Sequence, residues 1–389
     1  MRAVIYGIAA VVLLAFAAAV GAGPATTPPP LGLPPLPIPD DNPQTPEKVA
    51  LGDKLFHDIR FSSDGTVSCA TCHVREKAFT DGPLKVSEGV RKMAGTRNAP
   101  TIINAAYYTS TFWDGRTTGL EDQAQHPFIN PVEMELADHE PILEIVRTDP
   151  AYKKAFKEVF GKSGKDVTMT EVTKALAAFQ RTLISGNSPF DRWYFAGEEN
   201  AITEQQKRGF DLFVNKGRCV SCHTVEQTTA LFTDNKFHNI GVGINTIQND
   251  VPELAQKFLT ARMTLAEVDA AVLSDAKTSE LGRFAITKTL DHLGSFKTST
   301  LRNIALTAPY MHDGSVATLR ETVVHYNNGG VTNEGDPVND FLSGGIRPLN
   351  LTDQEIDDIV AFMEALTSPE FAPEAAKAMA EQEKKEKGR

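Results

Sequence analysis

Cysteine is scarce in this chain, and its scarcity narrows what the cysteines can do. Only four occur among the 389 residues, and all four lie in two C-x-x-C-H motifs, at residues 69–73 and 219–223. No thiol is left over for a disulfide or for a catalytic nucleophile. A zinc site, or a redox dithiol followed by a histidine, is the alternative interpretation of such a motif. Because two motifs consume every cysteine, the pattern favours covalent attachment of two c-type haems.

The spacing within each motif suits a porphyrin. Two thiols three positions apart at the start of a helix can both reach the vinyl groups on one edge of a haem. The next residue then faces the iron as a proximal imidazole ligand. The predicted haem-binding residues are therefore Cys69, Cys72 and His73 in the first motif and Cys219, Cys222 and His223 in the second.

The chain also lacks an excess of positive charge. It has 39 Lys and Arg against 50 Asp and Glu, which gives a formal net charge of −11. Nucleic acid is therefore not an expected partner, because its phosphates require a basic face. An acidic surface suits docking to a basic patch on another protein, although it also serves solubility alone.

Long apolar runs are lacking outside the N-terminus. Residues 1–23 have the features of an export signal, since Arg2 precedes an apolar run over residues 4–20 and small residues follow. An uncleaved membrane anchor is the alternative, whereas lipid attachment is excluded because no cysteine follows the run. Export agrees with the haem motifs, since c-type haem is attached outside the cytoplasm. The expected location is the periplasm.

The positions of the motifs predict two cytochrome c-like domains of mostly α structure with little sheet, each binding one covalent c-type haem. A weak internal repeat supports this prediction, because residues 52–56 and 209–213 share the pattern G-x-x-L-F and each precedes a motif. The expected divisions are a signal peptide at 1–23, a Pro-rich, unpacked linker at 24–44, an N-terminal haem domain at 45–188, a C-terminal haem domain at 189–370 and a charged, solvated tail at 371–389.

Local patterns predict individual elements. Apolar residues recur with helical spacing over 172–183. Capping boxes that begin at Thr203 and Thr352 each predict the start of a helix. Residues 237–242 and 295–304 fit either short strands or loops, and the pattern does not decide between them.

Several further motifs occur together with the two haem motifs. They are the segments TRNAP at 96–100, FWDGR at 112–116, LRN at 301–303 and APYMHDG at 308–314. In this order they resemble the bacterial di-haem cytochrome c peroxidases, including the MauG-like branch of that family. The resemblance covers roughly residues 45–370. It implies that the first haem reacts with peroxide and that the second haem receives electrons from a donor protein.

The resemblance also implies which residues do the chemistry. The family places a carboxylate and an amide over the first haem, and the matching positions are Glu133 and Gln123. A carboxylate beside the iron can move a proton between the two oxygens of peroxide, and an amide can hold the bound oxygen. The family also has a tryptophan between the haems that helps electrons to cross, and Trp113 matches it. Without the resemblance, Glu133 would pass for a surface acid and Trp113 for a core aromatic.

A calcium ion between the domains is implied in the same way. The family holds it with one asparagine side chain and two backbone carbonyls, a set of oxygen ligands that suits the ion. The matching positions are Asn98, Thr307 and Pro309.

One departure from the family pattern concerns the first haem. The best-known members carry a histidine in the loop after the first motif, and it blocks the iron until the second haem is reduced. Between His73 and Asn98 this chain has no histidine, and only Lys92 and Met93 could replace it. The expectation is an open sixth position on the first haem even in the fully oxidised protein, as in the MauG-like branch.

The second haem needs a distal ligand of its own. Classical members use a methionine where this chain has Tyr326, and the MauG-like branch has a tyrosine there. Tyr326 is therefore the first choice, with Met311 and His325 as alternatives. A phenolate stabilises ferric iron and lowers its potential, whereas a thioether has the opposite effect.

The sequence thus predicts a di-haem peroxidase that reduces hydrogen peroxide to water with electrons from a small cytochrome c or cupredoxin. One alternative is a MauG-like enzyme that oxidises a partner protein or another substrate. A second alternative is an electron carrier without catalysis, which would need no proton-handling pocket. Family members often form dimers, so a homodimer is compatible with the prediction, although no interface signature stands out.

Overall fold

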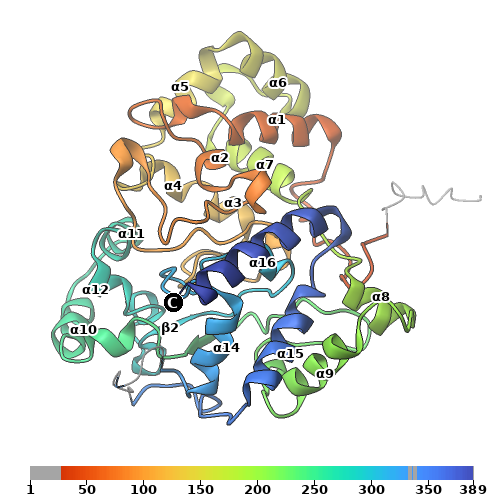
Figure 1. The fold of residues 1–389 in the computed structure, drawn as a ribbon. Helices are drawn as coiled ribbons and strands as arrows, with labels where there is room; N and C mark the ends of the chain where they lie inside the picture. Colours follow the sequence, from red (N-terminus) through yellow and green to blue (C-terminus); the bar gives the residue numbers. More distant parts are fainter. Residues whose placement is uncertain (1–27, 332–334, 336–339, 389) are drawn as a thin grey trace, which may run out of the picture.

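Helices dominate the computed structural model, which describes residues 28–331, 335 and 340–388 (Figure 1). The predicted export signal or anchor at residues 1–23 lies outside this range. Within the range, none of the helices has the length and apolar character needed to cross a membrane.

The helices and strands are short and are joined by long loops. The strands are β1 (Phe237–Asn239) and β2 (Ser295–Lys297). The helices are α1 (Pro46–Phe56), α2 (Cys69–Cys72), α3 (Gly119–Gln123), α4 (His126–Ile129), α5 (Glu140–Thr148), α6 (Pro150–Phe160), α7 (Met169–Gln180), α8 (Pro189–Ala196), α9 (Glu204–Val214), α10 (Val251–Thr260), α11 (Leu265–Ser274), α12 (Ala276–Ser279), α13 (Phe284–Thr287), α14 (Leu319–Asn327), α15 (Asp353–Glu364) and α16 (Ala372–Lys387).

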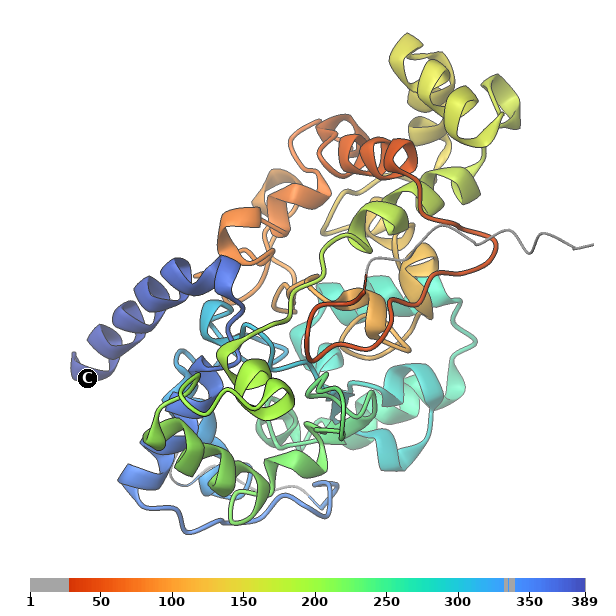
Figure 2. The same ribbon diagram turned by 90° about the vertical axis from the view of Figure 1, so that its right-hand side faces the viewer.

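Two hydrophobic cores divide the molecule. The first core includes buried residues from Leu51 to Phe179 and lies among α1–α7, at the top of Figure 1. The second core includes buried residues from Phe190 to Ala375 and lies among α8, α9, α14 and α15, at the bottom of the same view. Figure 2 shows the two groups of helices from the side. We call them the N-terminal and C-terminal lobes.

The internal repeat has a packing explanation. Gly52 lies where α1 crosses α7, and a Cβ atom at that position would collide with the backbone of Ala175. Gly209 occupies the equivalent position where α9 crosses α15, and a Cβ atom there would collide with the backbone of Asp358. The glycine of each G-x-x-L-F pattern therefore permits a close helix crossing. The phenylalanine of each pattern packs beside the histidine of the motif that follows.

A third cluster of apolar side chains joins the two lobes, and no motif predicted it. It is formed by α10–α13 and includes Phe258, Val272 and Phe284, all of them fully buried. Val132 of the N-terminal lobe packs against it. This helical insertion of the C-terminal lobe therefore reaches the segment that carries Glu133.

The only sheet in the described residues is the antiparallel pair of β1 and β2. Phe237 pairs with Lys297, His238 with Phe296 and Asn239 with Ser295. The two segments for which the sequence allowed strands or loops thus contain strands of three residues each, and the rest of both segments is loop.

The described part of the Pro-rich segment, residues 28–44, is packed rather than free, contrary to the expectation of an unpacked linker. Leu33 is 4% exposed and Asn42 is fully buried. The Gly32 carbonyl accepts a hydrogen bond of 2.9 Å from Arg302 in the C-terminal lobe, and the Pro34 carbonyl accepts one of 3.0 Å from Tyr107 in the N-terminal lobe. This strap, as we call residues 28–44, therefore binds both lobes.

The charged tail also differs from the solvated helix that was expected. Its helix, α16, lies across the C-terminal lobe in Figure 1. Gln382 of α16 is 3% exposed, and its amide bonds the backbone of Leu319 at 2.8 Å and of Ala305 at 3.3 Å. A buried amide with backbone partners on two other segments holds the helix in place, because leaving those groups unpaired would be costly.

Candidate active site

The first C-x-x-C-H motif forms a short helix that orients its histidine. Ser68 and Thr71 cap α2 through a hydrogen bond of 3.0 Å from the Ser68 amide to the Thr71 hydroxyl. His73 follows the helix, and its Nδ1 lies 3.0 Å from the Phe79 carbonyl, to which it donates. Burial lowers the pKa of His73 and favours the neutral ring. With Nδ1 engaged by a carbonyl, Nε2 is the nitrogen that can bind a metal.

The second motif repeats this arrangement. Nδ1 of His223 lies 2.9 Å from the Phe232 carbonyl, and burial lowers the pKa of the ring. The ring centroids of His223 and Phe213 are 6.5 Å apart, the same separation as between His73 and Phe56. Both motifs therefore present a neutral, oriented imidazole beside the phenylalanine of the repeat.

A cavity in the N-terminal lobe brings together the residues that the sequence singled out for peroxide chemistry. Cys69, Cys72 and His73 line it, as do Trp113, Gln123 and Glu133. It contains about 1500 Å³ of space that atoms do not fill, its mouth included. The remaining walls are largely apolar, as a porphyrin requires, and include Phe56, Ile102, Leu120, Met134 and Leu176.

Glu133 has the electrostatic environment of a proton-transfer group. Removal from bulk water raises its pKa to about 7, from an ordinary value of 4.5. This value already includes a smaller rise caused by the negative charge of Asp269 and an opposing decrease caused by the positive charge of Arg116. A carboxyl group with a pKa near neutrality can both accept and return a proton at physiological pH.

The charged network behind Glu133 was not predicted from the sequence. Nη1 of Arg116 lies 3.0 Å from both carboxylate oxygens of Asp114, and Nη2 lies 2.6 Å from Oδ1 of Asp269. All three side chains are at most 4% exposed. Asp114 and Arg116 belong to the FWDGR motif, which could have signalled a buried ion pair. Asp269 lies on α11, and no sequence pattern connects it to the cavity.

Trp113 lies where the two lobes meet. Its Nε1 donates a hydrogen bond of 2.8 Å to the Asn98 carbonyl. Its own carbonyl accepts one of 2.7 Å from the amide of Lys297 on β2. The indole is therefore held by both lobes while it lines the first cavity.

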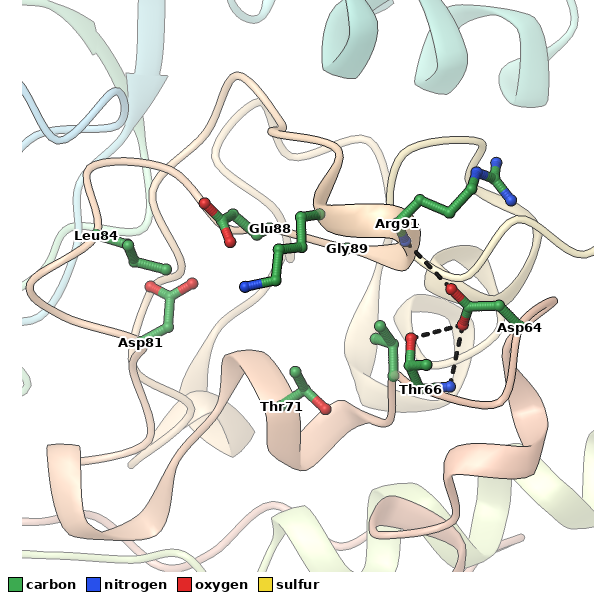
Figure 3. Close-up of a pocket in the computed structure, with 10 residues that line it drawn as sticks. Asp64, Thr66, Thr71, Asp81, Leu84, Glu88, Gly89 and Arg91 are labelled. Carbon is green, nitrogen blue, oxygen red and sulfur yellow. Dashed lines mark hydrogen bonds between the residues drawn. The ribbon is translucent and has the colours of Figure 1, made fainter.

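The two side chains that could replace the missing histidine of the loop after the first motif do not line this cavity. Val90–Lys92 forms a 3₁₀ turn whose first amide donates 2.9 Å to the Glu133 carbonyl. Lys92 is one of the residues that line a second pocket. Figure 3 shows this pocket with Glu88 and Arg91 labelled. Met93 packs against the first core. Neither Lys92 nor Met93 is among the described residues that line the haem cavity.

The three candidate distal ligands of the second haem differ in their surroundings. Nε2 of His325 lies 2.8 Å from the Ile240 carbonyl, so its ring is bound to backbone. Met311 packs against the second core. Burial raises the pKa of Tyr326, and its phenol is close enough to Cys219 and Cys222 that ionised thiols there would raise the pKa further. The phenol of Tyr326 therefore lies near the cysteines of the second motif.

The predicted calcium ligands lie on segments that meet at the lobe interface. The backbone N–H of Asn98 donates a hydrogen bond of 2.7 Å to the backbone carbonyl of His312, on the segment that contains Thr307 and Pro309. The side-chain Nδ2 of Asn98 donates 3.0 Å to the Lys85 carbonyl. This hydrogen bond orients the side-chain amide of Asn98 and leaves its Oδ1 available as a ligand atom, which suits an oxygen-binding cation.

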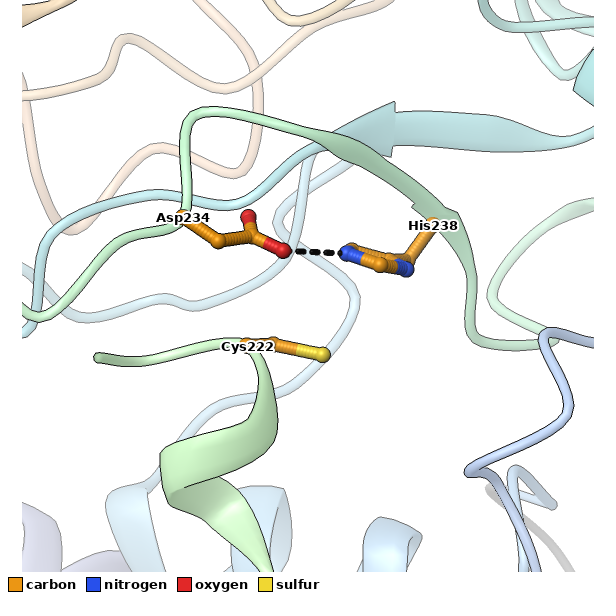
Figure 4. Close-up of side chains that lie close together, drawn as sticks. All are labelled: Cys222, Asp234 and His238. Atoms are coloured by element: carbon orange, nitrogen blue, oxygen red, sulfur yellow. Dashed lines mark hydrogen bonds and ion pairs between the residues drawn. The ribbon is translucent and has the colours of Figure 1, made fainter.

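The zinc alternative finds little support around the second motif. Cys222, Asp234 and His238 offer three ligand atoms within 4.8 Å of one another, and Nε2 of His238 lies 2.8 Å from Asp234 (Figure 4). Structural zinc requires four ligands, usually with both cysteines of such a motif. Among the described residues, the metal-binding groupings include only one motif cysteine.

A helical structure with two C-x-x-C-H motifs, one of which lines a cavity together with a carboxylate and an amide, is typical of a c-type haem protein. A family model described as di-haem cytochrome c peroxidase matches residues 46–200. The chain is 38% identical to cytochrome-c peroxidase IdrP1 of Denitromonas iodatirespirans, over 93% of this chain and 92% of that protein.

Two further comparisons agree. Methylamine utilization protein MauG of Methylorubrum extorquens is 38% identical over 85% of this chain and 81% of its own length. The crystal structure of a MauG-like protein associated with microbial copper homeostasis matches with a TM-score of 0.67 and 32% identity, over 89% of this chain and 95% of that one. The chain belongs to the di-haem cytochrome c peroxidase family, which includes MauG.

Proposed function

We propose that this protein is a di-haem peroxidase that reduces hydrogen peroxide to water with electrons from a small cytochrome c or cupredoxin. The observation that carries the proposal is a cavity lined both by Glu133 and Gln123 and by a motif with an oriented histidine. The names of the relatives, cytochrome-c peroxidase and MauG, support an oxidoreductase of this kind.

The cavity fits one covalently attached haem, held by Cys69, Cys72 and His73. A haem bound there supplies the iron at which the O–O bond of peroxide is broken. Overall, one hydrogen peroxide takes up two protons and two electrons and yields two water molecules. With a haem in place, Glu133 would accept a proton from one oxygen of hydrogen peroxide and return it to the other, and the amide of Gln123 would donate a hydrogen bond to the peroxide.

A second c-type haem, held by Cys219, Cys222 and His223, accepts electrons from the donor, and Tyr326 is its distal ligand. A phenolate keeps that haem ferric at low potential, which suits an enzyme that does not need prior reduction. Trp113, bonded to both lobes, lies on the route between the two motifs.

The remaining parts of the proposal concern location and metal. The N-terminal 23 residues direct export to the periplasm, where c-type haem is attached, with a membrane anchor as the alternative. One calcium ion is held by Asn98, Thr307 and Pro309. The protein acts as a monomer or a homodimer, and its acidic charge favours a donor with a basic docking patch.

Oxidation of a partner protein is the second candidate function. The absence of a histidine in the loop after the first motif and the proximity of Tyr326 to the second motif favour it. Identity to a MauG protein supports it too. An electron carrier without catalysis is disfavoured, because a carrier has no use for a carboxyl group with a pKa near 7 in a haem cavity.

Glu133→Gln tests the proposal. The amide is close to the carboxylate in size but cannot transfer the proton, so peroxide turnover with a reduced cytochrome c should fall ~100-fold or more. Electron transfer from the donor to the second haem should be unchanged. Full peroxide turnover in Glu133→Gln, or none in the wild type with any small donor, would contradict the proposal.

A further inference from the structure

Two buried cations line the first cavity without a carboxylate partner. Arg97 and Lys297 are each 8% exposed, and both face the cavity. The third cation there, Arg116, has both of its acids within 3.0 Å. Within the described ranges 28–331, 335 and 340–388, neither Arg97 nor Lys297 has an acid at ion-pair distance, and each bonds only uncharged groups.

Lys297 is the clearer case. Its ammonium donates one hydrogen bond of 3.2 Å to the Ser110 carbonyl and lies 3.5 Å from the centre of the Tyr108 ring. Burial lowers its pKa to about 7. An ammonium group has three donors, and burying it without an anion is unfavourable. Lys297 is one of the residues that line the cavity, so a ligand bound there can accept hydrogen bonds from its remaining donors.

Arg97 is held so that one end of its guanidinium is free. Nε donates 2.5 Å to the Ser279 hydroxyl and Nη2 donates 2.7 Å to the Ser279 carbonyl. Nη1 is buried and, in the described part of the chain, has no hydrogen-bond partner. The guanidinium lies 4.7 Å from the centre of the Phe296 ring, which fixes its plane. A buried, unpaired guanidinium nitrogen is a carboxylate-binding group.

We propose that Arg97 and Lys297 bind the two propionate carboxylates of the haem in the first cavity. The number of unpaired cations equals the number of carboxylates on a haem. Asp114, the acid whose charge acts on both cations, is already bound by Arg116 through both of its oxygens. The inference rests on the haem of the proposed function and extends it by naming what holds the charged edge of that haem.

The proposal makes the haem of the N-terminal lobe depend on the C-terminal lobe. Lys297 lies on β2, and Ser279, which orients Arg97, ends α12 of the helical insertion. The amide of Lys297 also binds the carbonyl of Trp113 at 2.7 Å. Strand β2 pairs with β1, where His238 lies beside Cys222 of the second motif (Figure 4). The cation therefore lies on the ribbon between the two motifs.

The reduction potential of the first haem tests this proposal, because a nearby cation favours the reduced iron whether or not it matters for folding. In holoprotein with both haems, Lys297→Met should lower the reduction equilibrium constant of the first haem by roughly tenfold, about 59 mV for a one-electron couple. Arg97→Gln should lower it in the same direction. Lys297→Arg should restore the wild-type potential, because it keeps the charge.

Lys236→Met is the matched control, since Lys236 is exposed, adjoins β1 and loses the same charge. In Lys236→Met the reduction potential of the first haem should equal that of the wild type. The propionate bending band in the resonance Raman spectrum of the first haem should shift in Lys297→Met and not in the control. If Lys297→Met does not fold, Lys297→Gln replaces it.

Unchanged potentials and unchanged propionate bands in Lys297→Met and Arg97→Gln would overturn the proposal. A haem content below two per chain in the wild type would instead contradict the proposed function, so the two failures can be told apart. A lower potential in Lys297→Met together with the wild-type potential in Lys297→Arg would support the assignment. A structural defect would not depend on whether the new side chain carries a charge.

Discussion

In the proposed function, the chemistry with peroxide depends on one residue, Glu133. Its carboxyl group is removed from water and faces the negative charge of Asp269, so it is protonated at a much higher pH than an ordinary glutamate. The carboxylate form is the one that accepts a proton from peroxide. The rate of the reaction with peroxide should therefore fall as the pH drops through about 7, the pKa of the group.

Asp269→Asn should move this pH profile. The substitution removes the anion that raises the pKa of Glu133, and Arg116 then acts on Glu133 with less of its charge neutralised. Both changes lower the pKa, so the half-maximal rate should occur at a lower pH. Stopped-flow rates measured from pH 5 to 9 would show the shift, because this range includes the raised pKa of Glu133 and extends towards its ordinary pKa.

Glu144→Gln provides the control for Asp269→Asn. It removes the same charge from an exposed position on α5 of the N-terminal lobe. Its pH profile should match that of the wild type. An unchanged profile in Asp269→Asn would show that Asp269 does not influence Glu133, and that burial alone sets the pKa.

At the scale of elements, α14 carries two of the candidate ligands for the proposed second haem. His325 and Tyr326 are neighbours on this helix, so they point in directions about 100° apart. His325 is bound to the Ile240 carbonyl at 2.8 Å, whereas the phenol of Tyr326 is near enough to Cys219 and Cys222 for their charges to act on it. The register of the helix therefore favours the phenol over the imidazole as an iron ligand.

Tyr326→Phe should change the absorption spectrum of the second haem, because the ring remains while the oxygen ligand is lost. Its potential should rise, since a phenolate stabilises ferric iron. Tyr310→Phe is the matched control, because it removes the same hydroxyl group from a buried tyrosine of the C-terminal lobe. An unchanged second-haem spectrum in Tyr326→Phe would exclude Tyr326 and leave Met311 or His325.

At the scale of the whole molecule, the strap joins the two lobes. Residues 28–44 bond Arg302 on one side and Tyr107 on the other, and Leu33 is buried between them. Arg302 is itself fully buried against Asp191, at 2.8 Å. The strap therefore contributes to the stability of the lobe interface, where the first cavity lies.

Leu33→Ala should lower the free energy of unfolding by about 2–5 kcal/mol, because it leaves a cavity at a buried position. Ile38→Ala, in the same segment, removes a similar side chain that is 39% exposed and should cost much less. Urea unfolding of the holoprotein would measure both. Equal, small effects would mean that the strap is loose in solution.

Much of this architecture was predictable because it depends on local signals. The two motifs, the repeated G-x-x-L-F pattern and the capping boxes at Thr203 and Thr352 each act over a few residues, and the helices follow them. The resemblance to a family supplied Glu133, Gln123 and Trp113, which the structure brings to one cavity. Position in the sequence alone would not have connected them.

What the sequence did not predict depends on contacts between distant residues. Asp269 reaches Arg116 only because α11 folds back over the N-terminal lobe. Leu33 and Gln382 are buried although proline-rich and charged segments usually remain solvated. Such contacts leave no periodic pattern, since each depends on a surface formed elsewhere in the chain.

In the proposed enzyme the first haem is open and reacts with peroxide without prior reduction. The most direct test is a stopped-flow absorption spectrum of the all-ferric protein after mixing with one equivalent of hydrogen peroxide. An open first haem should give a rapid change of the Soret band as soon as the protein is mixed with peroxide. A band that stays unchanged until one electron is added would mean that a side chain blocks the iron, and would contradict the claim.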